Sequence, residues 1–300
     1  MSIVMGFSMA PMRRLLKPLT LIWIIAATVI GSSRAQQPAS IAAAVDTHAV
    51  TAALNYAEGK NYTITLPNAV ALDLLWISPG TFTMGAPRSE DGSHEWERPQ
   101  TVVTISKGFW LGKTPVTQGQ YQAVMGNNPS RYVKAGLDAP VEMVSWHDAM
   151  KFCHRLTKKE QAAGHLPQGY AYTLPTEAQW EYACRAGATG ARYGNLDDIA
   201  WYAGNSGNST HPVGQKKPNA FGLYDMTGNV SQWCSDWYFE KLPGGNVTDP
   251  VGPDAGSYRV LRGGCWGDTA AICRSAGRYA NHPDLRASLF GFRLALAPAR

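Results

Sequence analysis

The residues of this 300-residue chain that could do chemistry are five cysteines, seven histidines and a group of arginines near the C-terminus. Thiolates hold soft metal ions or form disulfides, but five cysteines cannot all pair within one chain. The histidines are dispersed, and no H-x-x-x-H-x-E iron motif joins them. A lone histidine is usually solvated or structural, so we assign none of them to a metal.

The sequence leaves two roles open for four arginines, which are Arg262, Arg274, Arg278 and Arg293. Their guanidinium groups either hydrogen-bond backbone carbonyls and lock loops, or they line a cleft that receives an acidic or peptide ligand. Trp266 and Asn281 lie in the same part of the chain and would face that cleft.

Composition indicates the kind of fold that must position these groups. The chain is 45% hydrophobic and 16% charged, which is enough for one sizeable core. Thirty glycines, nineteen prolines and ten tryptophans favour short strands, many turns and buried rings, so we predict a loop-rich α+β domain. The net charge of +5 is scattered along the chain, so neither nucleic acid nor a membrane surface is an expected partner.

Residues 1–35 have the pattern of an export signal, in which a basic start precedes an apolar run from Leu19 to Ile30. The run is short for a membrane span, so we expect cleavage after Ala35 and an exported chain, periplasmic or secreted. The alternative is an uncleaved signal segment that anchors the chain in a membrane. Residues 36–70 are expected to form an N-terminal helix or a linker.

Three helix starts each carry a capping box, in which a serine or threonine stands three residues before a glutamine or aspartate. The pairs are Thr117 with Gln120, Ser145 with Asp148, and Thr176 with Gln179. Before them, residues 72–85 alternate in polarity around a Pro-Gly turn, which predicts two strands. Apolar stripes on the second and third helices are assigned to the core.

The stretch Asn219–Tyr238 combines several turn residues with five large aromatic side chains. Turn chemistry and so many rings rarely share a short segment unless the backbone folds tightly and the rings pack against a larger body. We interpret this stretch as the structural centre of the domain.

Seven motifs, taken in order, resemble the formylglycine-generating enzyme family, which is also called sulfatase-modifying-factor-like. They are FTMG (82–85), TPVTQGQY (114–121), PVEMVSWHDAMKFC (140–153), LPTEAQWEYACRAG (174–187), FGLYDMTGNVSQWCSDWY (221–238), RVLRGGCW (259–266) and GFRLAL (291–296). The resemblance covers residues 71–300 and implies one domain with a C-type-lectin-like α+β core, little regular secondary structure and bound calcium. The family includes copper oxidases that form formylglycine, sulfoxide synthases, a periplasmic protein of pyoverdine maturation, regulators of type VI secretion and lectin-like binders.

The resemblance maps a family calcium site onto the side chains of Asp225 and Gln232 and the carbonyls of Gly228 and Val230. A D-x-x-G-x-V-x-Q turn supplies two side-chain and two backbone oxygens, as a hard cation requires. Glutamine stands where the family usually has glutamate, which removes one negative charge. The region of Asn205 is the nearest counterpart of a second calcium loop. In the alternative interpretation, the side chains of the turn only cap it.

The oxidases of this family hold copper with two cysteines that follow a glycine pair, which corresponds to Gly263-Gly264. Read forward from that pair, the family's active-site serine corresponds to Cys265 and its first copper cysteine to Asp268. We therefore do not expect the usual copper centre. Cys265 and Asp268 are candidate catalytic residues of an unorthodox metal or redox site, unless Cys265 is only a small buried replacement for serine.

The resemblance also implies a disulfide between the third predicted helix and the C-terminal segment. Its first cysteine corresponds to Cys184, and Cys273 lies beside the position of the second because this chain is three residues shorter there. We therefore predict a Cys184–Cys273 disulfide, which an oxidising compartment would preserve.

Together these features predict an exported, calcium-binding member of the family that lacks the copper cysteine pair. Its expected role is a binding or regulatory module in the periplasm, for example of the type VI secretion regulator type. A peptide, a protein or a small metabolite would bind in a surface cleft. The alternative is a divergent oxidoreductase that acts on a peptide or a peptide-derived metabolite, of the formylglycine-forming or pyoverdine-maturation type.

Overall fold

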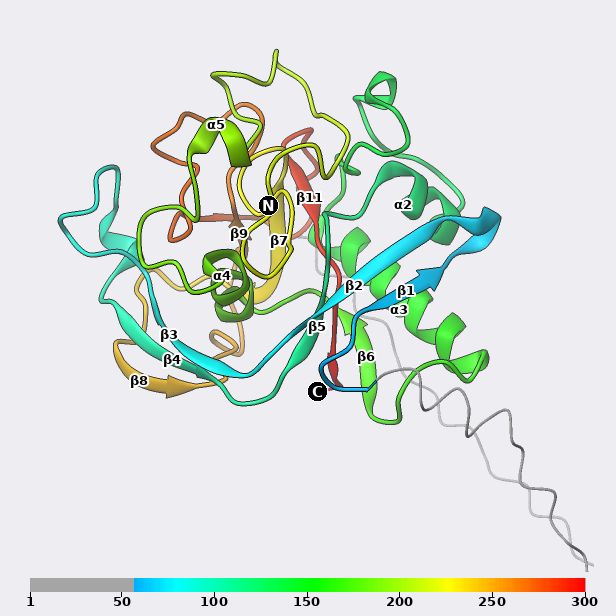
Figure 1. Cartoon of the computed structure of the whole chain (residues 1–300), viewed down its shortest axis with the longest axis horizontal. Coiled ribbons are helices and arrows are strands. Elements are labelled where there is room, and N and C mark those ends of the chain that lie inside the picture. Colours follow the sequence, from blue (N-terminus) through cyan, green and yellow to red (C-terminus); the bar gives the residue numbers. More distant parts are fainter. Residues whose placement is uncertain (1–56, 300) are drawn as a thin grey trace, which may run out of the picture. The chain divides into compact units, whose positions relative to one another are not determined.

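The computed structural model describes residues 57–299, in which twelve strands, short helices and long loops form an α+β domain (Figure 1). The predicted signal segment 1–35 and the greater part of segment 36–70 lie outside the described residues. Within residues 57–299, no helix is long and apolar enough to cross a membrane. The α+β prediction is confirmed.

The first sheet is antiparallel and has five strands in the order β1-β2-β5-β12-β6. Its strands are β1 (Tyr62–Thr65), β2 (Ala71–Ile77), β5 (Phe109–Gly112), β12 (Ala295–Pro298) and β6 (Tyr170–Thr173). Because β1 pairs with β2, the folded domain includes residues that we had expected in a helix or linker. Between these strands lies a short 3-10 helix, η1 (Pro67–Ala69).

The second sheet has the order β10-β9-β7-β11, and the third has the order β3-β4-β8. The second contains β10 (Arg278–Asn281), β9 (Arg259–Arg262), β7 (Ser231–Trp237) and β11 (Phe290–Phe292). The third contains β3 (Gly80–Met84), β4 (Thr101–Ile105) and β8 (Gly245–Thr248). The two strands predicted in residues 72–85 are present as β2 and β3, but they enter different sheets.

Three helices begin where the capping boxes predicted them, namely α2 (Gln118–Met125), α3 (Trp146–Ala162) and α4 (Glu177–Arg185). The short α5 (Leu196–Ile199) and the 3-10 turns η2 (Glu95–Glu97) and η3 (Val133–Ala135) were not predicted. At α3, the Ser145 hydroxyl accepts the Asp148 N–H and the Asp148 carboxylate accepts the Ser145 N–H. The same reciprocal bonds are present at the starts of α2 and α4.

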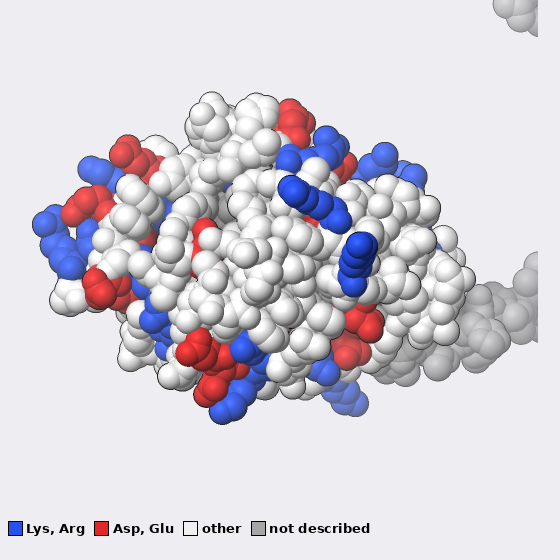
Figure 2. Space-filling model, turned by 90° about the horizontal axis from the view of Figure 1, so that it is seen from above, with Lys and Arg blue, Asp and Glu red and all other residues white. Residues whose placement is uncertain are grey.

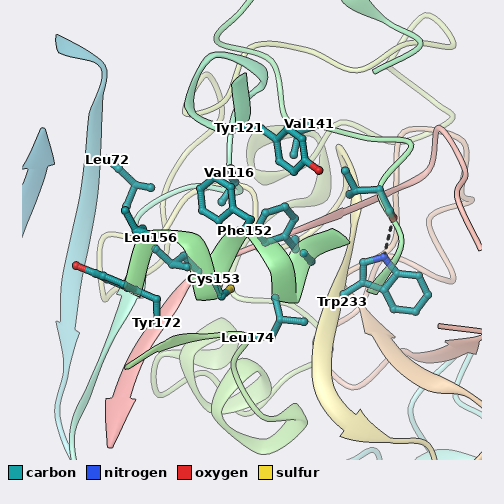
Figure 3. Close-up of a cluster of buried hydrophobic side chains, with 14 of the residues drawn as sticks. Leu72, Val116, Tyr121, Val141, Phe152, Cys153, Leu156, Tyr172, Leu174 and Trp233 are labelled. Atoms are coloured by element: carbon teal, nitrogen blue, oxygen red, sulfur yellow. Dashed lines mark hydrogen bonds between the residues drawn. The ribbon is translucent and has the colours of Figure 1, made fainter. Parts of the chain in front are cut away.

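The core has two clusters, and strand β7 contributes to both of them. In the first, the apolar face of α3 packs on α2 and the C-terminal strands, and the Phe152 ring stacks on Tyr121 at 5.8 Å (Figure 3). Trp233 of β7 belongs to this cluster and donates its indole N–H to the Val144 carbonyl at 3.0 Å. Its neighbour Cys234 belongs to the second cluster, with α4 and the third sheet. The predicted central place of Asn219–Tyr238 follows from this shared strand.

Candidate functional site

The glycine pair after β9 brings Cys265, Asp268 and Cys273 close to one another. Gly263 and Gly264 have φ angles of +94° and +72°, a region that favours glycine. A Cβ on Gly264 would lie 2.9 Å from the Cys273 sulfur and 3.5 Å from Asp268 Oδ2. The Cys265 N–H donates to Asp268 Oδ2 over 2.9 Å and closes the turn. The two predicted catalytic residues therefore meet, and Cys273 joins them.

Burial keeps the thiols of this cluster in their protonated form. Cys265 and Cys273 are both buried, and the Asp268 carboxylate lies beside them. Burial, followed by the charge of Asp268, raises the pKa of the Cys273 thiol to about 12 and raises that of Cys265 as well. Because the thiolate is the form that attacks substrates and binds metals, neither sulfur is activated in this state.

The predicted Cys184–Cys273 disulfide is not formed. All five cysteines are buried free thiols. The Cys184 thiol instead donates to the Ser275 hydroxyl at 3.7 Å. Ser275 lies opposite Cys184, whereas Cys273 lies against the glycine pair.

The arginines predicted to line a cleft are mostly buried in ion pairs. Arg278 donates to both carboxylate oxygens of Glu177 on α4 at 2.6 and 2.8 Å. Arg262 is fully buried and bonds Glu181, one turn further along the same helix. Burial by itself raises the pKa of Glu177, but the charge and hydrogen bonds of Arg278 outweigh burial and hold that pKa below its usual value. These guanidinium groups therefore connect α4 to the second sheet.

Of the other cleft candidates, Arg274 and Trp266 are also held by protein groups, whereas Arg278 lines the cavity described below. Arg274 bonds Glu97 at 2.5 and 2.9 Å and Glu90 at 2.6 Å. Trp266 donates its indole N–H to the Ser288 carbonyl at 2.9 Å. Asn281 is half-buried at the end of β10. The loop-locking role, left open by the sequence, is the one that these arginines have.

The turn predicted to hold calcium is closed by its own hydrogen bonds. Both Asp225 and Gln232 are fully buried. Gln232 Oε1 accepts the Trp180 indole N–H at 2.9 Å and Arg293 Nε at 3.0 Å, and Gln232 Nε2 donates to the Asp225 carbonyl at 2.8 Å. Asn205 bonds only inside its own loop, to Tyr202 N–H and the Ala200 carbonyl.

This donor set does not fit calcium as it is arranged. An ion in the turn would need the Gln232 oxygen, which already has two donors, and would meet the Gln232 NH₂ group at the Asp225 carbonyl. Among residues 57–299, no group of three or more histidine, cysteine, aspartate or glutamate side chains is placed to hold a metal. Calcium at this turn stays a prediction.

A cavity of about 500 Å³ lies beside the third sheet, and of the residues predicted to line a cleft it includes Arg278. Its walls include Val103, Val247, Trp237, Phe239, Leu242 and Pro250. Phe239 is 62% exposed and stands two residues beyond the end of β7. A concave apolar space of this volume is within the range of ligand sites, about 300–1,000 Å³. The sequence had singled out Arg278 of this lining, but it did not indicate the walls that come from the third sheet.

Two of the charged groups of the cavity form the ion pair described above. Glu177 and Arg278 line it, and their bidentate contact balances their charges. Asp236 also lines it, and its Oδ2 accepts the Glu177 N–H at 3.0 Å. The cavity therefore presents largely apolar walls, and its charged lining consists of the Glu177–Arg278 pair together with Asp236 and Lys241.

Charge on the outer surface is mixed. On the face seen in Figure 2, lysine and arginine side chains alternate with aspartate and glutamate side chains among large uncharged areas. This face carries no continuous basic patch of the kind that nucleic acid binding uses.

Comparison with known proteins identifies the family of this arrangement. Residues 64–298 match the model of the sulfatase-modifying factor enzyme 1-like domain. Chaperone protein LppX of Paenibacillus barcinonensis is 31% identical over 244 residues, which cover 66% of this chain and 79% of that protein. The formylglycine-generating enzyme of Streptomyces coelicolor is 36% identical over 180 residues, so this chain spans 52% of its length.

Among solved structures, Treponema denticola variable protein 1 has a TM-score of 0.69 and 32% identity, over 78% of this chain and 98% of that one. The match extends over both the α+β core and the long loops, so the C-type-lectin-like fold predicted from the motifs is confirmed. The chain belongs to the sulfatase-modifying factor enzyme 1-like family.

Proposed function

We propose that the chain is an exported binding or regulatory module of its family and that it does not oxidise its ligand by the copper mechanism. The observation that supports this proposal is the arrangement of Cys265, Asp268 and Cys273 behind Gly263-Gly264, which we call the glycine-pair cluster. Asp268 stands where a copper thiolate is expected, and burial raises the pKa of both neighbouring thiols. Soft copper(I) selects two thiolates, and here a carboxylate stands at the first of the two copper positions.

The cavity beside β8 is the binding site in this proposal. Its walls are largely apolar, and its Glu177 and Arg278 side chains bond each other, so an apolar portion of a peptide or protein suits it. The relative named as a chaperone protein supports a binding role, since this chain spans 79% of it. Export to the periplasm or beyond rests on the signal pattern in residues 1–35.

A phage-displayed random peptide library, selected on the purified mature chain, tests the site. We expect selected peptides to carry large apolar residues and to lose at least about tenfold in affinity for a Phe239→Ala variant, because the variant removes a wall of the cavity. Leu285→Ala removes an exposed apolar side chain outside the cavity lining and serves as the matched control. Peptides that depend on Leu285 and ignore Phe239 would place binding elsewhere and reject this site.

A second candidate, the divergent oxidoreductase, is favoured by one observation. Cys265, Asp268 and Cys273 converge behind the glycine pair, and the half-exposed Tyr279 lies close enough for Asp268 and Cys273 to raise its pKa, after burial, to about 12. Such a group of thiols beside the surface could take part in redox chemistry if a ligand altered its surroundings.

Copper(I) titration in the presence of a cysteine-containing peptide separates the two candidates. The binding proposal predicts no stoichiometric copper, no uptake of dioxygen and no aldehyde in the peptide. It also predicts full peptide affinity for a Cys265→Ser variant, because serine fills nearly the same space. Stoichiometric copper together with aldehyde formation that is lost in Cys265→Ser would select the oxidoreductase.

A further inference from the structure

The hydrogen-bonding capacity of Gln232 is used almost completely inside the protein. Its Oε1 accepts two donors, the Trp180 indole N–H and Arg293 Nε, and its Nε2 donates to the Asp225 carbonyl. The two donors on one atom fix which end of the amide is oxygen, so the side chain cannot be flipped without losing three bonds. The amide therefore joins the turn to α4 and to the strand end at Arg293.

Arg293 has no exposed surface, and each of its three nitrogens donates to a protein oxygen. Nε bonds Gln232, and the two terminal nitrogens bond the carbonyls of Gly112 and Tyr224. Tyr224 is the residue before Asp225, so the guanidinium reaches the turn through its backbone as well as through the amide. Burial lowers the pKa of Arg293 to about 10, and the nearby Asp225 opposes that shift.

Asp225 is the one acidic side chain in the turn, and it too is satisfied. Its Oδ2 accepts the Gly214 N–H at 2.7 Å, and its Oδ1 accepts the Asn229 amide at 3.3 Å. The residue has a φ angle of +49°, so the backbone is already in the tight conformation of the turn. The turn therefore holds one buried carboxylate, and the buried Arg293 guanidinium is near enough to influence it electrostatically, so no net negative charge is left to offset a divalent ion.

We propose that Arg293, rather than a calcium ion, is the cation that holds the Asp225–Gln232 turn, and that the chain folds without calcium. A calcium ion placed among these oxygens would compete with Arg293 for Gln232 and would be repelled by it in a poorly screened interior. Where the family usually has glutamate this chain has Gln232, so the turn lacks the second carboxylate that would outweigh this repulsion. The Gln232 NH₂ group donates directly to the Asp225 carbonyl, at the position where a calcium ion would have bound that oxygen.

The wild-type chain gives the first test. We expect purified mature protein to contain less than about 0.1 calcium per chain by atomic emission, and its melting temperature to change by less than about 1 °C between excess EDTA and millimolar calcium. A ligand that binds only the folded state would raise that temperature. One calcium per chain, or a melting temperature that falls in EDTA, would overturn the proposal.

A Gln232→Glu variant tests the role of the amide, with terbium as the probe for a calcium-like ion. The Trp180 indole contacts the position and would sensitise terbium emission. We expect this variant to give terbium emission and a melting temperature that rises with calcium, because the added carboxylate opens the Asp225 carbonyl to a metal.

The exposed Gln161→Glu variant makes the same charge change on α3 and should resemble wild type. If Gln232→Glu shows no terbium emission and no change of melting temperature with calcium, then the proposal that the Gln232 amide prevents calcium binding at this turn is wrong. Equal terbium emission from the wild-type chain would contradict the proposal as well.

Discussion

The Glu142 carboxyl group is fully buried between the strand bridge at Pro140 and the start of α3. Its Oε1 accepts the Tyr132 N–H at 2.7 Å, and no group in residues 57–299 bonds its Oε2. Burial raises the pKa of Glu142 to about 7, although the backbone donors of Tyr132 and Arg131 act in the opposite direction. Sequence gave no reason to single out this glutamate, because its burial depends on a loop that returns from α2.

The raised pKa of Glu142 leads us to predict that the free energy of unfolding decreases as the pH rises. Its pKa is raised in the folded state, so its contribution is complete below the ordinary value near 4.5 and disappears as the pH rises through about 7. We expect the free energy of unfolding in urea to fall by roughly 2 kcal/mol between about pH 5 and pH 8 on this account. Glu142→Gln should flatten that slope, whereas exposed Glu240→Gln should not. An unchanged slope in Glu142→Gln would refute the assignment.

Helix α4 shows how one element is fixed by partners from distant parts of the chain. Glu177 and Glu181 stand one helical turn apart and receive Arg278 from β10 and Arg262 from β9. Breaking a buried ion pair leaves an uncompensated charge, which costs about 3–5 kcal/mol. The helix therefore depends on the second sheet more than on its own capping box.

Glu177→Gln is predicted to destabilise the protein by about 3 kcal/mol at neutral pH. The pKa of Glu177 is lowered in the folded state, so the stability that it contributes is present above its ordinary pKa and is lost as the pH falls below it. The difference in unfolding free energy between the variant and the wild type should therefore become smaller at acid pH. Urea unfolding at each pH measures this difference. Asp198→Asn, which breaks the exposed pair with Lys217, should change stability by less than about 0.5 kcal/mol. A similar loss of stability in both variants would show that the burial of the Glu177–Arg278 pair does not increase its contribution to stability.

At the scale of the whole molecule, the cysteines are buried as free thiols and are not joined by disulfides. All five cysteines are buried, and none forms a disulfide. Burial raises the pKa of Cys153, Cys184 and Cys234 as it does for the glycine-pair cysteines. Stability then comes from two apolar clusters and buried ion pairs, without covalent cross-links.

We predict that the five thiols of the native protein react with Ellman's reagent only at the rate of global opening, because a buried protonated thiol must first reach solvent. All five should react at once in concentrated urea. Fewer than five reactive thiols in urea without reductant would reveal a disulfide, and one thiol that reacts rapidly in the native state would reveal an activated cysteine.

The sequence by itself determined the features that depend on neighbouring residues. The capping pairs, such as Ser145 with Asp148, are three residues apart and form in the structure as predicted. The α+β class followed from the density of glycine, proline and tryptophan, and the family followed from ordered motifs. In each case the contacts that matter are local, or the evidence is spread over the whole chain.

Only the tertiary structure decided the partners of the functional groups. Arg274 meets Glu97 across 177 residues, and Cys184 meets Ser275 across 91. Ser275, rather than the predicted Cys273, is the partner of Cys184, and the local sequence could not decide between two positions that are two residues apart. Gln232, Arg293 and the cavity at Phe239 are likewise products of several distant segments meeting. Side-chain partners at such separations follow from how the sheets pack, and no pattern of adjacent residues encodes them.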